Sequence, residues 1–135
     1  MQPGGSNVIG YRVAALVVVL LMSGCAATSD DWQTLATTGD AIARHEATFV
    51  EHQRKLYLIG GRGIKPVTVF APATRRWEKK ATPPLEIHHV QAVSLGDAIY
   101  LVGAMTGGYP DETPIARVLR YLPAEDRFEW THEIP

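Results

Sequence analysis

Short apolar runs separated by turn-forming residues recur along most of the chain. The runs "KLYLIGG" (residues 55–61) and "AIYLVGA" (residues 98–104) place Tyr, Leu, a β-branched residue and Gly in the same order, with Tyr57 matching Tyr100. The 12 Gly and 9 Pro residues cluster between apolar runs. Turn-forming residues at this spacing favour many short strands over long helices. The pattern therefore predicts an all-β fold.

The two runs are parts of a longer internal repeat. Residues 45–61 align without a gap on residues 88–104, at an offset of 43, and residues 67–77 align on residues 118–128, at an offset of 51. The second copy therefore carries eight extra residues between its halves. They fall within "AMTGGYPDETPIAR" (residues 104–117), whose Gly, Pro and acidic residues are typical of a loop.

Each copy of the repeat divides into four predicted strands, separated by the turn signals "EHQR", "APATR", "SLGD" and "LPAED". The predicted strands are residues 47–51, 55–60, 66–70 and 76–79 in the first copy, and residues 90–94, 98–103, 116–121 and 127–131 in the second. Nearly continuous apolar runs such as "YLIGG" suit strands that are buried on both faces. Strands stacked between neighbouring sheets have that environment.

A unit of about 45 residues with four strands, a glycine that closes the second strand and a late aromatic residue resembles the kelch repeat, one blade of a β-propeller. The residues at the repeat positions are Tyr57, Gly60, Gly61, Phe70 and Trp77 in the first copy, and Tyr100, Gly103, Tyr121 and Phe128 in the second. The second copy departs from the pattern with Ala104 in place of the second glycine. It also has Phe128 in place of the tryptophan, but Trp130 lies on the same strand face.

The resemblance implies two four-stranded antiparallel kelch-type blades, a partial propeller, over residues 44–86 and 87–135. A propeller usually has four to eight blades, and each blade buries its face against the next. We therefore expect the chain either to be the N-terminal part of a longer propeller or to complete one as a homo-oligomer. A truncated, non-functional remnant is a further alternative.

The first 24 residues have the pattern of an export signal. A basic residue precedes an apolar run at residues 13–22, which is too short to span a bilayer. "MSGC" (residues 22–25) resembles the bacterial lipoprotein box, which implies a signal-peptide helix over residues 1–24, lipidation of Cys25 and a place on the periplasmic face of the outer membrane. An ordinary thiol at Cys25 is the alternative. Residues 25–43 would form a tether, in which Trp32 lies either on a strand that closes the propeller or in an irregular segment.

Composition and motifs favour a binding module over an enzyme. The formal net charge of −1 lacks the basic excess of nucleic-acid-binding proteins, and no catalytic, cofactor or zinc motif is present. In kelch-type propellers, ligands meet the loops on one side, here residues 61–66, 80–89 and 104–117, which we call the loop face. Its candidate binding residues are Arg62, Lys65, His89, Tyr109, Asp111 and Glu112. The expected partner is a protein or a glycan.

Three other kinds of chemistry bear on this interpretation. Adjacent His88 and His89 on a strand would point to opposite sides, so the sequence predicts no metal site there. Galactose-oxidase-like propellers need a cysteine crosslinked to a tyrosine, and the only cysteine lies in the lipoprotein box. A resemblance to periplasmic sialic-acid mutarotases would place His45 and Glu46 near the central channel as acid/base groups, which keeps a sugar mutarotase or epimerase as the enzymatic alternative.

Overall fold

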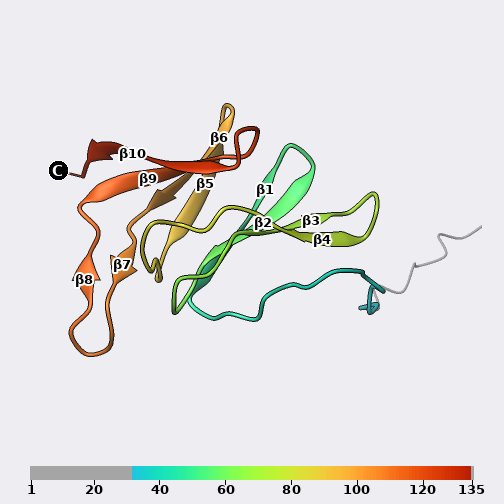
Figure 1. The fold of residues 1–135 in the computed structure, drawn as a ribbon, viewed down its shortest axis with the longest axis horizontal. Helices are drawn as coiled ribbons and strands as arrows, with labels where there is room; N and C mark the ends of the chain where they lie inside the picture. The colour runs from blue at the N-terminus through green and yellow to red at the C-terminus, as the bar shows by residue number, and fades with distance from the viewer. Residues whose placement is uncertain (1–31, 135) are drawn as a thin grey trace, which may run out of the picture. The chain divides into compact units, whose positions relative to one another are not determined.

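The computed structural model describes residues 32–134, and this part of the chain is all β, with no helix (Figure 1). The first sheet has the strand order β1-β2-β3-β4. Its strands are β1 (Ala47–His52), β2 (Lys55–Gly60), β3 (Thr68–Ala71) and β4 (Arg76–Lys79). The signal-peptide helix predicted for residues 1–24, and Cys25 with it, lie outside the described residues. Within residues 32–134 no helix is long and apolar enough to cross a membrane.

The second sheet repeats the first, with the order β10-β9-β6-β5. Its strands are β5 (Gln91–Leu95), β6 (Ala98–Val102), β9 (Arg117–Leu122) and β10 (Arg127–Glu133). All pairings in both sheets are antiparallel. The prediction of two four-stranded antiparallel sheets is confirmed. The stretch at residues 104–117, which holds the extra residues and was predicted as a loop, also contains a small antiparallel pair, β7 (Met105–Thr106) with β8 (Thr113–Pro114).

One buried core joins the two sheets. Tyr57 of β2 and Ile99 of β6 both lie in it, and the rings of Tyr57 and Tyr121 are 6.1 Å apart. The amide of Ala92 donates a 3.0 Å hydrogen bond to the hydroxyl of Thr48 across the sheets. By the repeat, Ile99 matches Leu56, which points to the opposite face of β2 from Tyr57. The face that the second sheet presents to the junction is therefore the counterpart of the face of the first sheet that points away from it. This is how successive repeats of one kind stack.

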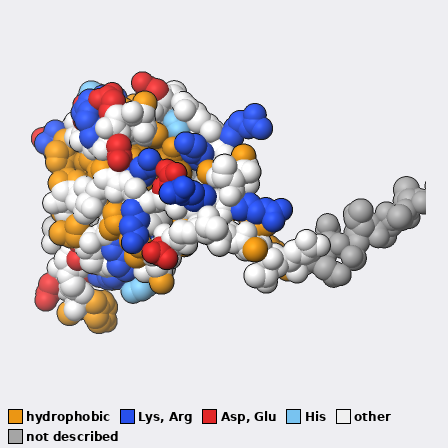
Figure 2. Space-filling view, turned by 45° about the vertical axis from the view of Figure 1, so that its right-hand side comes forward, with side chains coloured by type: hydrophobic (Ala, Val, Ile, Leu, Met, Phe, Trp, Pro, Cys, Tyr) orange, Lys and Arg blue, Asp and Glu red, His pale blue; other side chains and the backbone are white. Residues whose placement is uncertain are grey.

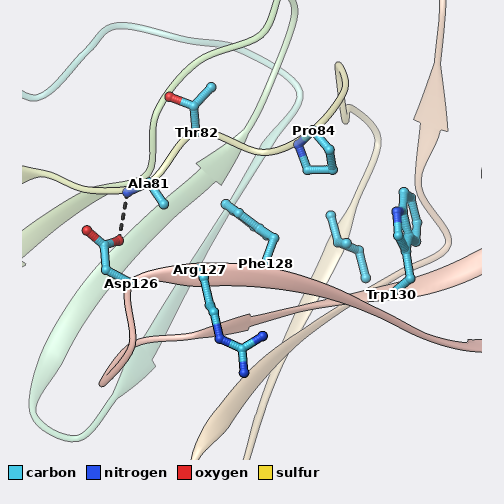
Figure 3. A pocket seen from close by; sticks show the side chains of 8 residues that line it. Ala81, Thr82, Pro84, Asp126, Arg127, Phe128 and Trp130 are labelled. Carbon is cyan, nitrogen blue, oxygen red and sulfur yellow. Dashed lines mark hydrogen bonds between the residues drawn. The ribbon is translucent and has the colours of Figure 1, made fainter.

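The segment that precedes each sheet contacts that sheet's outer edge at equivalent positions, in one case through a side chain and in the other through the backbone. In the second sheet, the amide of Ala81 donates a 2.7 Å hydrogen bond to Asp126 Oδ1 beside the β9–β10 turn (Figure 3). In the first, the amide of Thr38 donates to the carbonyl of Arg75, the repeat counterpart of Asp126, at 3.0 Å. Residues 32–37 have no strand structure, and Thr38 forms only a single bridge to β4. The closing strand proposed for Trp32 therefore stays a prediction.

The aromatic repeat positions form the same pair in both sheets. The rings of Phe70 and Trp77 lie 5.0 Å apart on β3 and β4, and those of Tyr121 and Phe128 lie 5.0 Å apart on β9 and β10. Phe128 and Trp130 both point into one open hollow under the segment at residues 81–84, as expected for residues two apart on a strand (Figure 3). The two aromatic pairs give each sheet the same packing unit between its outer strands.

Candidate functional site

A charged cluster lies where the loop face meets the junction of the two sheets. Its members are Glu46, just before β1, Arg62, just after β2, His88 and His89, before β5, and Glu112, just before β8. Three of them, Arg62, His89 and Glu112, are among the six binding residues predicted from the sequence. The β7–β8 hairpin projects at this end, away from the β1–β2 and β5–β6 turns (Figure 1).

Arg62 connects the cluster. Its guanidinium forms an ion pair with Glu112, and its Nε lies 2.5 Å from Glu46 Oε2. Its Nη1 also donates a 3.0 Å hydrogen bond to the carbonyl of Gly107. One side chain thus ties the first sheet's entry and exit segments to the extension of the second sheet. Glu112, with a further contribution from Glu46, raises the pKa of Arg62 against the opposing effect of burial.

The histidine pair differs from the sequence expectation. His88 and His89 were predicted to point to opposite sides of a strand, but their Nδ1 atoms lie 3.1 Å apart. The reason is that His89 has a φ of +50°, which breaks the strand alternation. His88 is completely buried, whereas His89 is exposed. His88 Nε2 lies 3.0 Å from the Gly107 carbonyl oxygen and 3.2 Å from Arg62 Nη1, so the buried ring joins the contacts that Arg62 makes with the extension.

Glu46 carries the negative charge at the centre of the cluster. Its Oε2 lies 3.8 Å from His88 Nδ1 and 3.7 Å from His89 Nε2. This oxygen is buried and accepts no hydrogen bond from the described residues, so its contact with Arg62 is an ion pair without hydrogen-bond alignment. Burial acts to raise the pKa of Glu46, but the close contact and charge of Arg62, with His89 and His45, outweigh it and lower that pKa.

The cluster has donor atoms that metals use, but its carboxylates are already paired. One ligand atom from each of Glu46, His88, His89 and Glu112 lies within 4.8 Å of the others. The guanidinium of Arg62 contacts both carboxylates, and a bound cation would have to displace it. We therefore assign no metal to the cluster.

The other predicted binding residues lie around the cluster without joining it. Lys65 Nζ donates a 3.2 Å hydrogen bond to the carbonyl of Ala43. Tyr109 is 86% exposed, and Asp111 beside it is exposed as well. The β2–β3 loop is fixed to the segment before β5 by a 2.9 Å hydrogen bond from the amide of Gly63 to Glu86 Oε1. Sequence reasoning named Glu46 only as a possible acid/base group and did not predict its pairing with Arg62.

A recess separate from the charged cluster lies near the opposite end of the second sheet. It is an open hollow of about 360 Å³ lined by Ala81, Thr82, Pro84, Leu119, Asp126, Arg127, Phe128 and Trp130 (Figure 3). Phe128 and Trp130 point into it, and Arg127 at its edge is paired with Glu125 and Glu129. Elsewhere on the molecule, basic and acidic side chains are interspersed over the face drawn in Figure 2.

Comparison with known proteins gives one distant similarity. No family model matches the chain. The chain is 26% identical over 112 residues to Kelch-like protein 35 of Mus musculus, an alignment that covers 79% of this chain and 18% of that protein. The chain thus spans about a fifth of the length of the curated relative that it matches. This similarity and the two antiparallel four-stranded sheets fit a kelch-like β-sheet fold.

Proposed function

We propose that the chain is a kelch-type binding module that engages a protein partner through the loop face. The observation that carries the proposal is the set of contacts that Arg62 makes with Glu46, Glu112 and the carbonyl of Gly107, which we call the clasp. The clasp joins segments of both sheets into one surface. Loops that are held by a rigid scaffold are the usual place for binding residues. The distant similarity to a kelch-like protein supports the same function class.

The contact chemistry of this surface comes from the side chains that the clasp leaves free. Tyr109 and Ile64 are 86% and 59% exposed, and His89 is half-exposed. Aromatic side chains at a rim of mixed charge are typical of protein interfaces, because they bury much area with few rotatable bonds. Arg62 and the two glutamates position these groups, since their own charges are paired within the protein.

The test is site-specific photo-crosslinking in the cells that express the chain. A photoreactive phenylalanine analogue replaces Tyr109 on the loop face, and in a matched control it replaces Asp97, which is exposed in the β5–β6 turn at the other end. We expect a discrete protein adduct from position 109 and none from position 97. Equal labelling from both positions, or none from either, would contradict the proposal. A thermal shift with a simple sugar, followed by turnover, would favour the mutarotase alternative.

Membrane attachment through Cys25 remains part of the proposal. In this account, a lipid on the mature N-terminus holds the loop face at the periplasmic side of the outer membrane. Metabolic labelling with a fatty acid should mark the natural chain and should fail for Cys25→Ser. Labelling that persists in Cys25→Ser would reject lipidation at this residue and leave the loop-face proposal untouched.

A further inference from the structure

The repeat that relates the two sheets also relates their two outward surfaces. Tyr57 and Ile59 of the first sheet face the second sheet, and their repeat counterparts Tyr100 and Val102 lie on the far side of the second sheet. We call that side the outer face of the second sheet. It comprises Gln91, Val93, Leu95, Tyr100, Val102, Val118 and Arg120. Val93, Leu95 and Val102 are 46%, 66% and 37% exposed.

The first sheet carries the complementary surface. The second sheet meets the first through Ala92, Ile99, Leu101, Tyr121 and Phe128. The repeat counterparts of these residues form what we call the outer face of the first sheet: Phe49, Leu56, Leu58, Phe70 and Trp77. Phe49 is 56% exposed on this face. One chain therefore carries one surface of each kind that its own sheet junction brings together, with Phe70 already buried in that of the first sheet.

Two glycines show that one junction is occupied and its counterpart is open. A Cβ at Gly60 would lie 2.5 Å from the carbonyl oxygen of Ile87, whereas a Cβ at Gly103 would meet nothing within 4 Å. The amide of Gly61 donates a 2.7 Å hydrogen bond to Ile87, but the matching amide of Ala104 has no acceptor among residues 32–134. An apolar hollow of about 420 Å³ opens there, lined by Gly103, Ala104, Met105, Pro114, Ile115, Ala116 and Ile134.

We propose that a second copy of this chain packs the outer face of its first sheet on the outer face of the second sheet, head to tail. The contact would repeat the geometry of the sheet junction within one chain. The amide of Ala104 would donate to the carbonyl of Arg44 in the second copy, as Gly61 donates to Ile87. Tyr100 would meet Phe70, as Tyr57 meets Tyr121.

The polar groups on the surface are compatible with this burial. Thr48 accepts the Ala92 amide in the existing junction, and its counterpart Gln91 offers a side-chain oxygen to the matching amide of Phe49. Arg120 and Glu129 lie on the outer face of the second sheet, but they are paired by a 2.6 Å hydrogen bond. Glu51, the repeat counterpart of Ser94, lies at the exposed end of the outer face of the first sheet and pairs with no cation among residues 32–134, so its carboxylate must stay in solvent at the edge of the contact. Head-to-tail contacts of this kind close into rings when the rotation per copy allows it.

The experiment measures the solution mass of the full chain in a non-ionic detergent, by light scattering over a concentration series. Val93→Lys places a charge on the outer face of the second sheet, and Phe49→Lys does so on that of the first. Leu95→Lys, at a site 66% exposed, is a second variant of the same face should Val93→Lys disturb the fold. Ala124→Lys, at an exposed site in the β9–β10 turn, is the matched control. Circular dichroism checks that each variant is folded.

We expect the natural chain and Ala124→Lys to associate, and each face variant to have the mass of one chain. Val93→Lys keeps an intact outer face of the first sheet, and Phe49→Lys keeps an intact outer face of the second sheet. When the two variants are mixed, these two intact faces can still pack together. The mixture should therefore form a one-to-one dimer and nothing larger. A natural chain that stays monomeric at every concentration overturns the proposal. So do face variants that associate like the natural chain, or a mixture that stays monomeric.

Discussion

Gly60 at the end of β2 and Gly103 directly after β6 allow a quantitative test of the sheet junction. Gly60 and Gly103 are repeat counterparts with similar backbone angles, φ +76° and +66°. An alanine at either position has to adopt the left-handed conformation, which lowers the free energy of unfolding by about 1–2 kcal/mol. Only at Gly60 does the new Cβ meet backbone, because Ile87 O would be 2.5 Å away. Ile87 must then retreat, which breaks its hydrogen bond with the Gly61 amide.

The expected difference follows from that lost contact. A net hydrogen bond contributes about 0.5–1.5 kcal/mol, and the retreat of Ile87 also loosens apolar packing at the junction. We therefore expect Gly60→Ala to lower the free energy of unfolding by about 2–4 kcal/mol and Gly103→Ala by about 1–2 kcal/mol. For a domain of this size a difference of about 1 kcal/mol corresponds to roughly 4–8 °C in melting temperature.

The assay is chemical and thermal denaturation of both variants in a Val93→Lys background, which removes any contribution from association. Gly60→Ala should melt at the lower temperature. Equal losses for the two variants, or a larger loss for Gly103→Ala, would refute the assigned packing of the segment before β5 on the first sheet.

Three further predictions concern the polar contacts. Thr48→Val leaves a buried amide of the second sheet without an acceptor and should cost about 1–3 kcal/mol in denaturant unfolding, while Thr48→Ser should keep most of the stability. Tyr121→Phe removes the 2.6 Å hydrogen bond to Asp126 and should cost about 1 kcal/mol in the same assay. Arg62 lowers the pKa of Glu46 below its ordinary 4.5, so this contact stabilises the fold above that pH and is lost as pH falls through the lowered pKa. Melting temperatures from pH 7 to 3 should therefore fall less for Glu46→Gln than for the natural chain.

Much of the fold could be predicted because its information is local. Apolar runs with turn residues between them defined all eight strands of the two main sheets, within a few residues at each end. The internal repeat then supplied the division of these strands into two like sheets. The same alignment supplied the aromatic positions Phe70, Trp77, Tyr121 and Phe128, and the structure shows that they form two equivalent ring pairs.

The rest of the fold depends on contacts that a local pattern does not carry. Met105 of β7 exchanges two 2.9 Å backbone hydrogen bonds with His88, a partner distant in the sequence, so the Gly- and Pro-rich extension read only as a loop. The prediction that His88 and His89 diverge was wrong because His89 is left-handed. Glu46, its repeat counterpart, is left-handed too, with a φ of +56°. Neither residue is a glycine or asparagine, which would have signalled this conformation.

The most direct test of the account is amide hydrogen exchange at the two counterpart positions Gly61 and Ala104. The account claims that the two sheets pack as successive units of one repeat, with the segment before β5 seated on the end of β2. In the monomeric Val93→Lys chain, the Gly61 amide should therefore exchange slowly and the Ala104 amide quickly. In the natural chain, docking of a second copy should slow Ala104 as well. A Gly61 amide that exchanges as fast as that of Ala104 in the monomer would contradict the packing on which the account rests.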